Sequence, residues 1–105
     1  MKNPRSAIAS LTLDAVLVPS PDQVASAMGG EVALLNIDTG VYYGLDGVGA
    51  RVWDLIQQPR PLAEIRDILL SEYEVPPARL EPDLLALAAS LLSEGLAELT
   101  DGHGD

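Results

Sequence analysis

The sequence lacks the residues on which many catalytic and metal centres depend. Its 105 residues include no cysteine, which excludes disulfides, thiolate metal sites and cysteine nucleophiles. The single histidine, His103, lies between two glycines near the C-terminus, where a solvated side chain without a catalytic role is expected. Residues 44–49 are rich in glycine but have neither the spacing nor the lysine of a phosphate-binding loop. The sequence therefore predicts a protein that is not an enzyme and needs no metal or other cofactor.

Basic residues are also scarce. The chain has six Lys and Arg residues and sixteen Asp and Glu residues, which gives a formal net charge of -10. Neither Lys nor Arg follows Arg79. Nucleic-acid binding requires cations that neutralise phosphates, so no nucleic-acid partner is expected, and a basic or neutral peptide is the better electrostatic match. Paired carboxylates could still perform acid–base chemistry, but most of the acids lie at predicted helix starts or on solvent faces, where helix capping and solubility explain them.

Long apolar runs are missing as well. No segment approaches the roughly 18 apolar residues of a membrane span. Residues 1–11 carry Lys2 and Arg5 but lack the apolar stretch of a signal peptide. We therefore expect a cytoplasmic protein without a membrane partner. Its length suits one compact domain at residues 13–100, between flexible ends at residues 1–12 and 101–105.

The strongest local signal is a β-hairpin. Residues 31–36 and 41–45 are rich in β-forming side chains, and the loop between them contains Asp38 and Gly40, which favour a tight turn. In the second of these strands Tyr42 must project to the face opposite its neighbours, because side chains alternate along a strand. One tyrosine can then pack inward while the other faces an exposed groove. Two further extended segments are predicted before this hairpin, at residues 13–18 and 23–28.

Helical patterns fill the rest of the domain. Asp46 is a suitable N-cap for the first helix, and Gly95 occupies the position expected of a C-cap after the last. Residues 96–99 are expected to add a short returning segment. Three helices are predicted between these limits, at residues 48–58, 62–73 and 82–94. The predicted fold class is therefore α+β, a short sheet followed by three helices.

The third predicted helix is apolar around most of its circumference. One stripe contains Leu84, Leu87, Ala88 and Leu91, and a second, with Leu85, Ala89 and Leu92, lies beside it. That width exceeds what a simple surface helix needs, so a second contact is expected along this helix. Trp53, inside the first helix, is interpreted as a core anchor rather than a ligand contact.

The order of these elements and several of their residues resemble the PqqD family and its relatives, which are small precursor-recognition domains of ribosomal peptide biosynthesis. The resemblance covers about residues 16–96. It implies a winged-helix-like fold with a three-stranded antiparallel sheet and three helices, which binds the leader segment of a precursor peptide. The residues that carry it are the hairpin at 34–43, Leu45-Asp46, Gly49-Ala50, Trp53, the helix start at 62–65 and the closing segment at 83–96.

In this family the leader adds as a strand to the sheet edge formed by the third strand, and its side chains lie in a groove bounded by the third helix. An exposed strand edge is also, on general grounds, a template for strand addition. Asp46 departs from the asparagine usual in the family and places an extra charge near the groove. Mapped onto this sequence, the predicted peptide-binding residues are Val41, Tyr42, Tyr43 and Gly44, facing Leu85, Ala89 and Leu92.

The resemblance leaves two pathways open. The hairpin is most similar to stand-alone recognition subunits of lasso-peptide clusters, which work beside a cysteine leader peptidase and a cyclase. PqqD proper instead serves a radical S-adenosylmethionine enzyme that acts on the precursor of a quinone cofactor. We prefer the lasso assignment, and we expect a monomer.

Two other functions are compatible with the predicted elements. A winged-helix regulator would place the third helix in DNA, but that helix carries Glu81, Asp83 and Glu94 and no base, which disfavours it. A structural subunit could dock on a larger enzyme through the apolar third helix. The sequence does not separate this role from peptide binding, because one surface can serve both partners.

Overall fold

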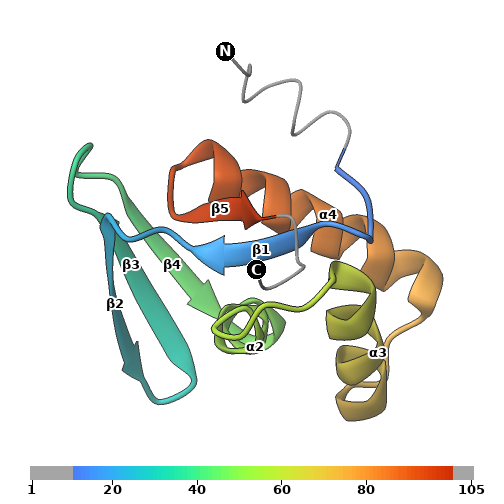
Figure 1. Cartoon of the computed structure of the whole chain (residues 1–105). Coiled ribbons are helices and arrows are strands. Elements are labelled where there is room, and N and C mark those ends of the chain that lie inside the picture. The colour runs from blue at the N-terminus through green and yellow to red at the C-terminus, as the bar shows by residue number, and fades with distance from the viewer. Residues whose placement is uncertain (1–10, 101–105) are drawn as a thin grey trace.

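The computed structural model describes residues 11–100, which form two small antiparallel sheets and three helices (Figure 1). The larger sheet has the order β2-β3-β4, and the smaller pairs β1 with β5. These findings confirm the predicted α+β class, with a three-stranded antiparallel sheet followed by three helices. The elements are β1 (Val16–Pro19), β2 (Gln23–Met28), β3 (Glu31–Asn36), β4 (Tyr42–Asp46), α2 (Gly47–Leu55), α3 (Leu62–Glu72), α4 (Pro77–Ser93) and β5 (Ala97–Thr100).

The smaller sheet joins the two ends of the domain. The predicted returning segment at 96–99 is strand β5, which pairs with β1 so that Leu17 lies opposite Leu99. The first strand begins at Val16 rather than at residue 13. Before it, the carbonyl oxygens of Leu13 and Ala15 accept hydrogen bonds from the start of α3, at 2.8 and 2.9 Å. The chain therefore enters the domain along α3 and leaves it beside β1.

A single aliphatic core fills the space between the larger sheet and the helices. Leu34 and Leu45 enter it from the sheet, and Trp53 is 5% exposed, which confirms its interpretation as a core anchor. Helix α2 packs against β3 and β4, whereas α4 packs against α3 and β5. The helices contribute mainly Val52, Leu55, Ile56, Leu62, Ile65, Leu69, Leu80, Leu84, Ala88 and Leu91 to this core.

The observed helix boundaries differ from the predicted ones in two places. The last helix begins at Pro77 instead of residue 82, because a proline fits the first turn of a helix as well at Pro77, and Pro82 is accommodated inside it. The first ends at Leu55 rather than at residue 58. Asp46 is the N-cap residue as predicted, although its side chain makes no capping hydrogen bond. Gly95, with φ of 71°, follows α4 in the left-handed conformation of a C-cap.

Candidate functional site

Strand β4 forms one free edge of the larger sheet, since its only strand partner within residues 11–100 is β3. The backbone N–H of Asn36 donates to the carbonyl oxygen of Val41 at 2.9 Å, which sets the alternation of the ladder. In an antiparallel pair every second residue bonds to its partner. Tyr43 therefore bonds toward β3, and the N–H and C=O groups of Tyr42 and Gly44 point away from the sheet. These groups are ready to pair with an added strand.

The side chains of β4 divide between the two faces of the sheet, as the alternation predicts. Tyr42 is 70% exposed on the face turned away from the helices. Val41 and Tyr43 are half-buried on the inner face, and Leu45 on that same face is buried. A peptide strand added to β4 would alternate in the same way, with every second side chain directed toward the helices.

The turn between β3 and β4 is tied to the C-terminal end of α4 by Asn36, the last residue of β3. Its buried amide nitrogen Nδ2 donates to the carbonyl oxygens of Glu94 and Gly95, at 3.0 and 3.4 Å. Its Oδ1 accepts from the backbone N–H groups of Asp38 and Thr39, at 2.9 and 3.2 Å. One side chain thus shapes the hairpin turn and attaches it to the C-terminal end of α4.

Near the other end of β4, Gly49 in the first turn of α2 lies close to Leu45 of β4 and to Leu87 of α4. A Cβ atom on Gly49 would lie 3.4 Å from Cδ2 of Leu45 and 3.9 Å from Cδ2 of Leu87. Between this point and the Asn36 tie, the helix rises by about 10 Å from Leu87 to Glu94. The strand rises by a similar distance, about 13 Å, from Val41 to Leu45. The helix and strand segments between these two points are therefore similar in length, while the main packing partners of α4 are α3 and β5.

A hollow opens at the Gly49 end, between α2 and the N-terminal half of α4. It has a volume of about 340 Å³, and we call it the α2–α4 hollow. Its mouth carries Arg79 and Asp83, whose side chains approach to 4.0 Å. An apolar side chain would fit its lining, which consists mainly of Val48, Gly49, Val52, Leu69, Val75, Leu80, Leu84 and Leu87.

The structure brings only part of the predicted site together. Val41, Tyr42, Tyr43 and Gly44 lie along one strand edge, with Val41 just before β4. Leu85, Ala89 and Leu92 are half-buried on α4. Their contact with a peptide stays a prediction.

Leu87 is an α4 residue that lies close to Gly49, which is itself in contact range of Leu45 on β4. It follows Leu85 by two residues, so the two side chains point about 200° apart around the helix. Leu85 and Ala89 therefore belong to a different flank from Leu87. No local pattern indicates the tie at Asn36 or the close approach at Gly49, because both depend on residues far apart in the chain.

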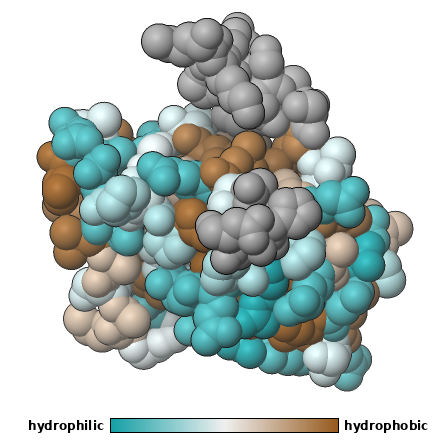
Figure 2. Space-filling view, in the orientation of Figure 1, coloured by the Kyte–Doolittle hydropathy of each residue, from teal (hydrophilic) through white to brown (hydrophobic). Residues whose placement is uncertain are grey.

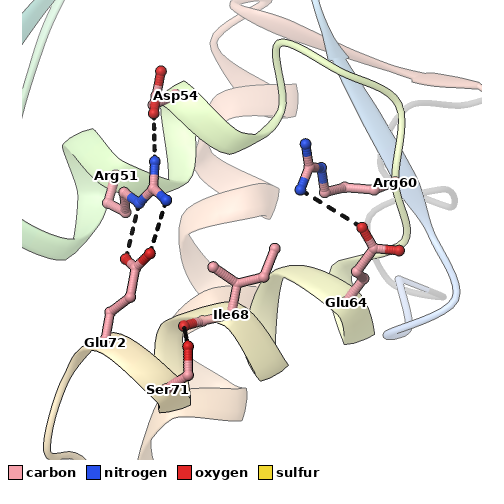
Figure 3. A network of polar contacts seen from close by, with 7 residues as sticks. All are labelled: Arg51, Asp54, Arg60, Glu64, Ile68, Ser71 and Glu72. Atoms are coloured by element: carbon pink, nitrogen blue, oxygen red, sulfur yellow. Dashed lines mark hydrogen bonds and ion pairs between the residues drawn. The ribbon is translucent and has the colours of Figure 1, made fainter.

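An ion-pair network joins α2 to α3 (Figure 3). The guanidinium of Arg51 donates to both carboxylate oxygens of Glu72, at 2.9 and 2.8 Å, and also to Asp54. The hydrogen bond from Arg51 lowers the pKa of Glu72, and the same bond raises the pKa of Arg51. The network is exposed, so its expected role is to position the two helices.

Two classes of feature are not found within residues 11–100. No group of three or more His, Asp or Glu side chains is placed to hold a metal ion. None of the described helices combines the length and the apolarity that a bilayer span requires.

Comparisons with known proteins agree with the geometry. The sequence profile of the family described as coenzyme PQQ synthesis protein D (PqqD) matches residues 31–97. Curated proteins gave no match. A structure of TbiB1 in complex with the TbiA(beta) leader peptide is 35% identical, with a TM-score of 0.73, over 84% of this chain and 99% of that chain. A lasso peptide synthetase B1 complexed with the leader peptide is 27% identical, with a TM-score of 0.71, over 78% of this chain and 96% of that chain. Because the profile covers more than half of the sequence, the chain belongs to the PqqD family.

Proposed function

We propose that this protein binds the leader segment of a ribosomally made precursor peptide by strand addition to β4, and that it presents the precursor to a separate enzyme. The observation that carries the proposal is the free edge of β4, where the N–H and C=O groups of Tyr42 and Gly44 point away from the sheet. The two similar structures support it, because each is a complex with a leader peptide.

Main-chain pairing with Tyr42 and Gly44 supplies affinity that does not depend on the peptide sequence. Selectivity comes from the side chains that point inward. Along β4 the inward side chains of the peptide contact Tyr43 and then the region of Leu45 and Gly49. A peptide that continues past Leu45 reaches the α2–α4 hollow. The leader is therefore an extended peptide with an apolar side chain at the position that enters the hollow.

The protein acts by positioning and contributes no reacting group. Holding the leader on β4 raises the local concentration of the attached core peptide at the enzyme that modifies it. The chemistry belongs to that enzyme, and this chain requires neither a metal nor a cofactor for its part.

We favour a pathway of the lasso-peptide type, in which the receiving enzyme is a cysteine leader peptidase. The similarity to a lasso peptide synthetase B1 supports this choice. The family description keeps a second candidate, a role beside a radical S-adenosylmethionine enzyme in the synthesis of a quinone cofactor.

Fluorescence anisotropy with a labelled leader peptide from the same biosynthetic cluster tests the proposal. Tyr42→Pro removes an N–H that points away from β3, so the internal ladder is retained, and leader affinity should fall by about tenfold or more. Tyr42→Ala controls for the lost ring. Ala25→Pro is the matched change on the opposite edge, where the N–H of Ala25 also points away from β3. Equal losses in Tyr42→Pro and Ala25→Pro would reject β4 as the binding edge.

The same assay separates the two pathways. Competition between a leader from a lasso precursor and a leader from a quinone-cofactor precursor should favour the lasso leader. Preference for the other peptide would move the protein to the second candidate pathway and leave the β4 site in place.

A further inference from the structure

The outer face of the three-stranded sheet, turned away from the helices, concentrates the exposed apolar side chains of the molecule. Within residues 11–100, seven large hydrophobic residues are exposed, and five of them lie on this face or on its continuation. The register aligns Val24, Leu35 and Tyr42 in one row across the three strands. Brown spheres lie along the left of the molecule in Figure 2, over this sheet. The five residues are Val24, Met28, Leu35, Ile37 and Tyr42.

A hollow of about 430 Å³ lies in the middle of this face. Its floor is the row formed by Ser26, Ala33 and Gly44, which are paired across the three strands and carry little or no side chain. Tyr42 and Met28 stand on opposite sides of that row. The face therefore offers a socket for one bulky side chain of a partner, with apolar contacts from Tyr42 and Met28 and with Glu31 and Asp46 at its acidic end.

The charged residues on the strands of the three-stranded sheet and on its turns are all acidic. The sequence from residue 11 to residue 50 contains no Lys or Arg. Glu31 and Asp46 are opposite each other in the register at one end of the sheet, and Asp22 and Asp38 lie near the other. A second copy of this chain, with its net charge of -10, would meet repulsion here, whereas a surface with Lys and Arg at its rim would be attracted.

We propose that the outer face docks the enzyme that acts on the leader-bound precursor, through a surface of that enzyme with an apolar centre and a basic rim. The inference rests on the proposed function, because it assigns the second partner of the same recognition step. The docking face is continuous with the leader edge. Tyr42 and Gly44 offer their backbone to the peptide and also line the hollow of the outer face. An enzyme seated there lies against the strand that the leader extends.

The test uses a double variant, Val24→Lys with Met28→Lys. Both side chains are more than half exposed, at 56% and 78%, and β2 is separated from the leader edge by β3. The folded state and leader affinity should therefore be retained, with leader affinity changed by less than about twofold. The probe is the purified leader peptidase of the same pathway. Its association with the recognition protein, measured by biolayer interferometry without leader, should weaken by about tenfold or more. Leu99→Lys on β5 is the matched control and should leave association unchanged.

The rim charges provide a second measurement. Glu31→Lys should weaken association and reduce its dependence on salt, whereas Asp67→Lys on α3 should do neither. Peptidase association that is unaffected by the double variant, with leader binding intact, would overturn the docking face alone. Failure of the wild-type protein to bind leader would instead overturn the proposed function. A wild-type dimer in light scattering that becomes a monomer in the double variant would assign the face to a second copy and reject the proposal.

Discussion

The three-stranded sheet has two free edges within the described chain, and each adjoins a hollow. Beside β2 the N–H and C=O groups of Ala25 and Ala27 point outward, since Ile37 donates its N–H to the carbonyl oxygen of Asp22 at 3.0 Å and sets the alternation there. The hollow on this side has a volume of about 670 Å³ and lies between the β2–β3 turn region and α2. In backbone chemistry alone, the two edges are equivalent.

The two edges differ in the contacts that hold the helical wall of the hollow beside each strand. On the β4 side, Asn36 binds the end of α4, and Leu45 and Leu87 both lie close to Gly49. On the β2 side, the lining includes apolar Ala50 and Trp53 but also the Arg51–Asp54 ion pair, which is partly exposed to solvent. A free edge becomes a selective peptide site when an apolar wall is held at a fixed distance from it, because side-chain pockets require a constant geometry. The contrast favours β4 over β2.

Removal of the Asn36 tie should have the largest effect on this contrast. Asn36→Ala deletes hydrogen bonds at both ends of a buried side chain, so stability should fall by about 2–4 kcal/mol in chemical denaturation. Leader affinity, measured where the variant is folded, should fall as well because α4 is no longer held beside the hairpin. Thr39→Ala, in the same turn but exposed, should cost less than about 1 kcal/mol. Intact affinity in folded Asn36→Ala would show that the tie is dispensable for binding.

The two flanks of α4 provide the next test. Leu87→Asp places a charge at the inner end of β4, and leader affinity should fall by about thirtyfold, or 2 kcal/mol. Leu85→Asp is matched to it, because both leucines are half-buried on the same helix. It should change affinity by less than about threefold if the flank with Leu87 faces the peptide. The reverse ranking would return the peptide to the flank formed by Leu85, Ala89 and Leu92.

A smaller effect is expected at Gly49. Gly49→Ala should stabilise α2 by up to about 1 kcal/mol, because alanine is the better helix former. The new methyl group lies against Leu45 at the entrance to the α2–α4 hollow, so leader affinity should fall a few-fold. Gly47→Ala in the same helix should instead lower stability, because Gly47 has φ of 53°, a conformation that alanine adopts only with strain. Chemical denaturation measures the stability of both variants, and fluorescence anisotropy measures their leader affinity. Unchanged affinity in Gly49→Ala would show that the leader does not contact the α2–α4 hollow.

The smallest effect should come from the β2 side. Glu72→Gln weakens the bond to Arg51 and should slightly lower the thermal midpoint at pH 7 without changing leader affinity. The pKa of Glu72 is lower in the folded protein than its ordinary value of 4.5. The pair therefore stabilises the fold above that value, and the contribution is lost as the pH falls through the folded pKa. The difference from wild type should vanish at a pH well below the folded pKa of Glu72, and Glu74→Gln, outside the network, should leave the thermal midpoint at pH 7 unchanged. A difference that persists in acid would assign the effect to packing.

Local patterns were sufficient for the hairpin. Asp38 and Gly40 between two β-rich runs indicated the turn, and the alternation of Tyr42 and Tyr43 followed from strand geometry alone. The start of α4 was wrong because prolines suit several positions in the first turn, and Pro77 and Pro82 compete for that role. Which residues of α4 form the wall of the site stays a prediction. Helical spacing relates Leu85 to Leu87 in angle but does not say which of them faces β4.

Residue type and short-range spacing were enough to predict the fold class, the hairpin and the three helices, and the lack of cysteine is a plain fact of the sequence. The prediction that His103 has no catalytic role concerns a residue outside the described range 11–100. The folded chain was needed to show that Asn36 reaches Glu94 and that Leu45 and Leu87 both approach Gly49. It also gathered the exposed side chains of β2, β3 and β4 on one acidic face. These features join segments up to 58 residues apart, and their geometry depends on how the whole core packs.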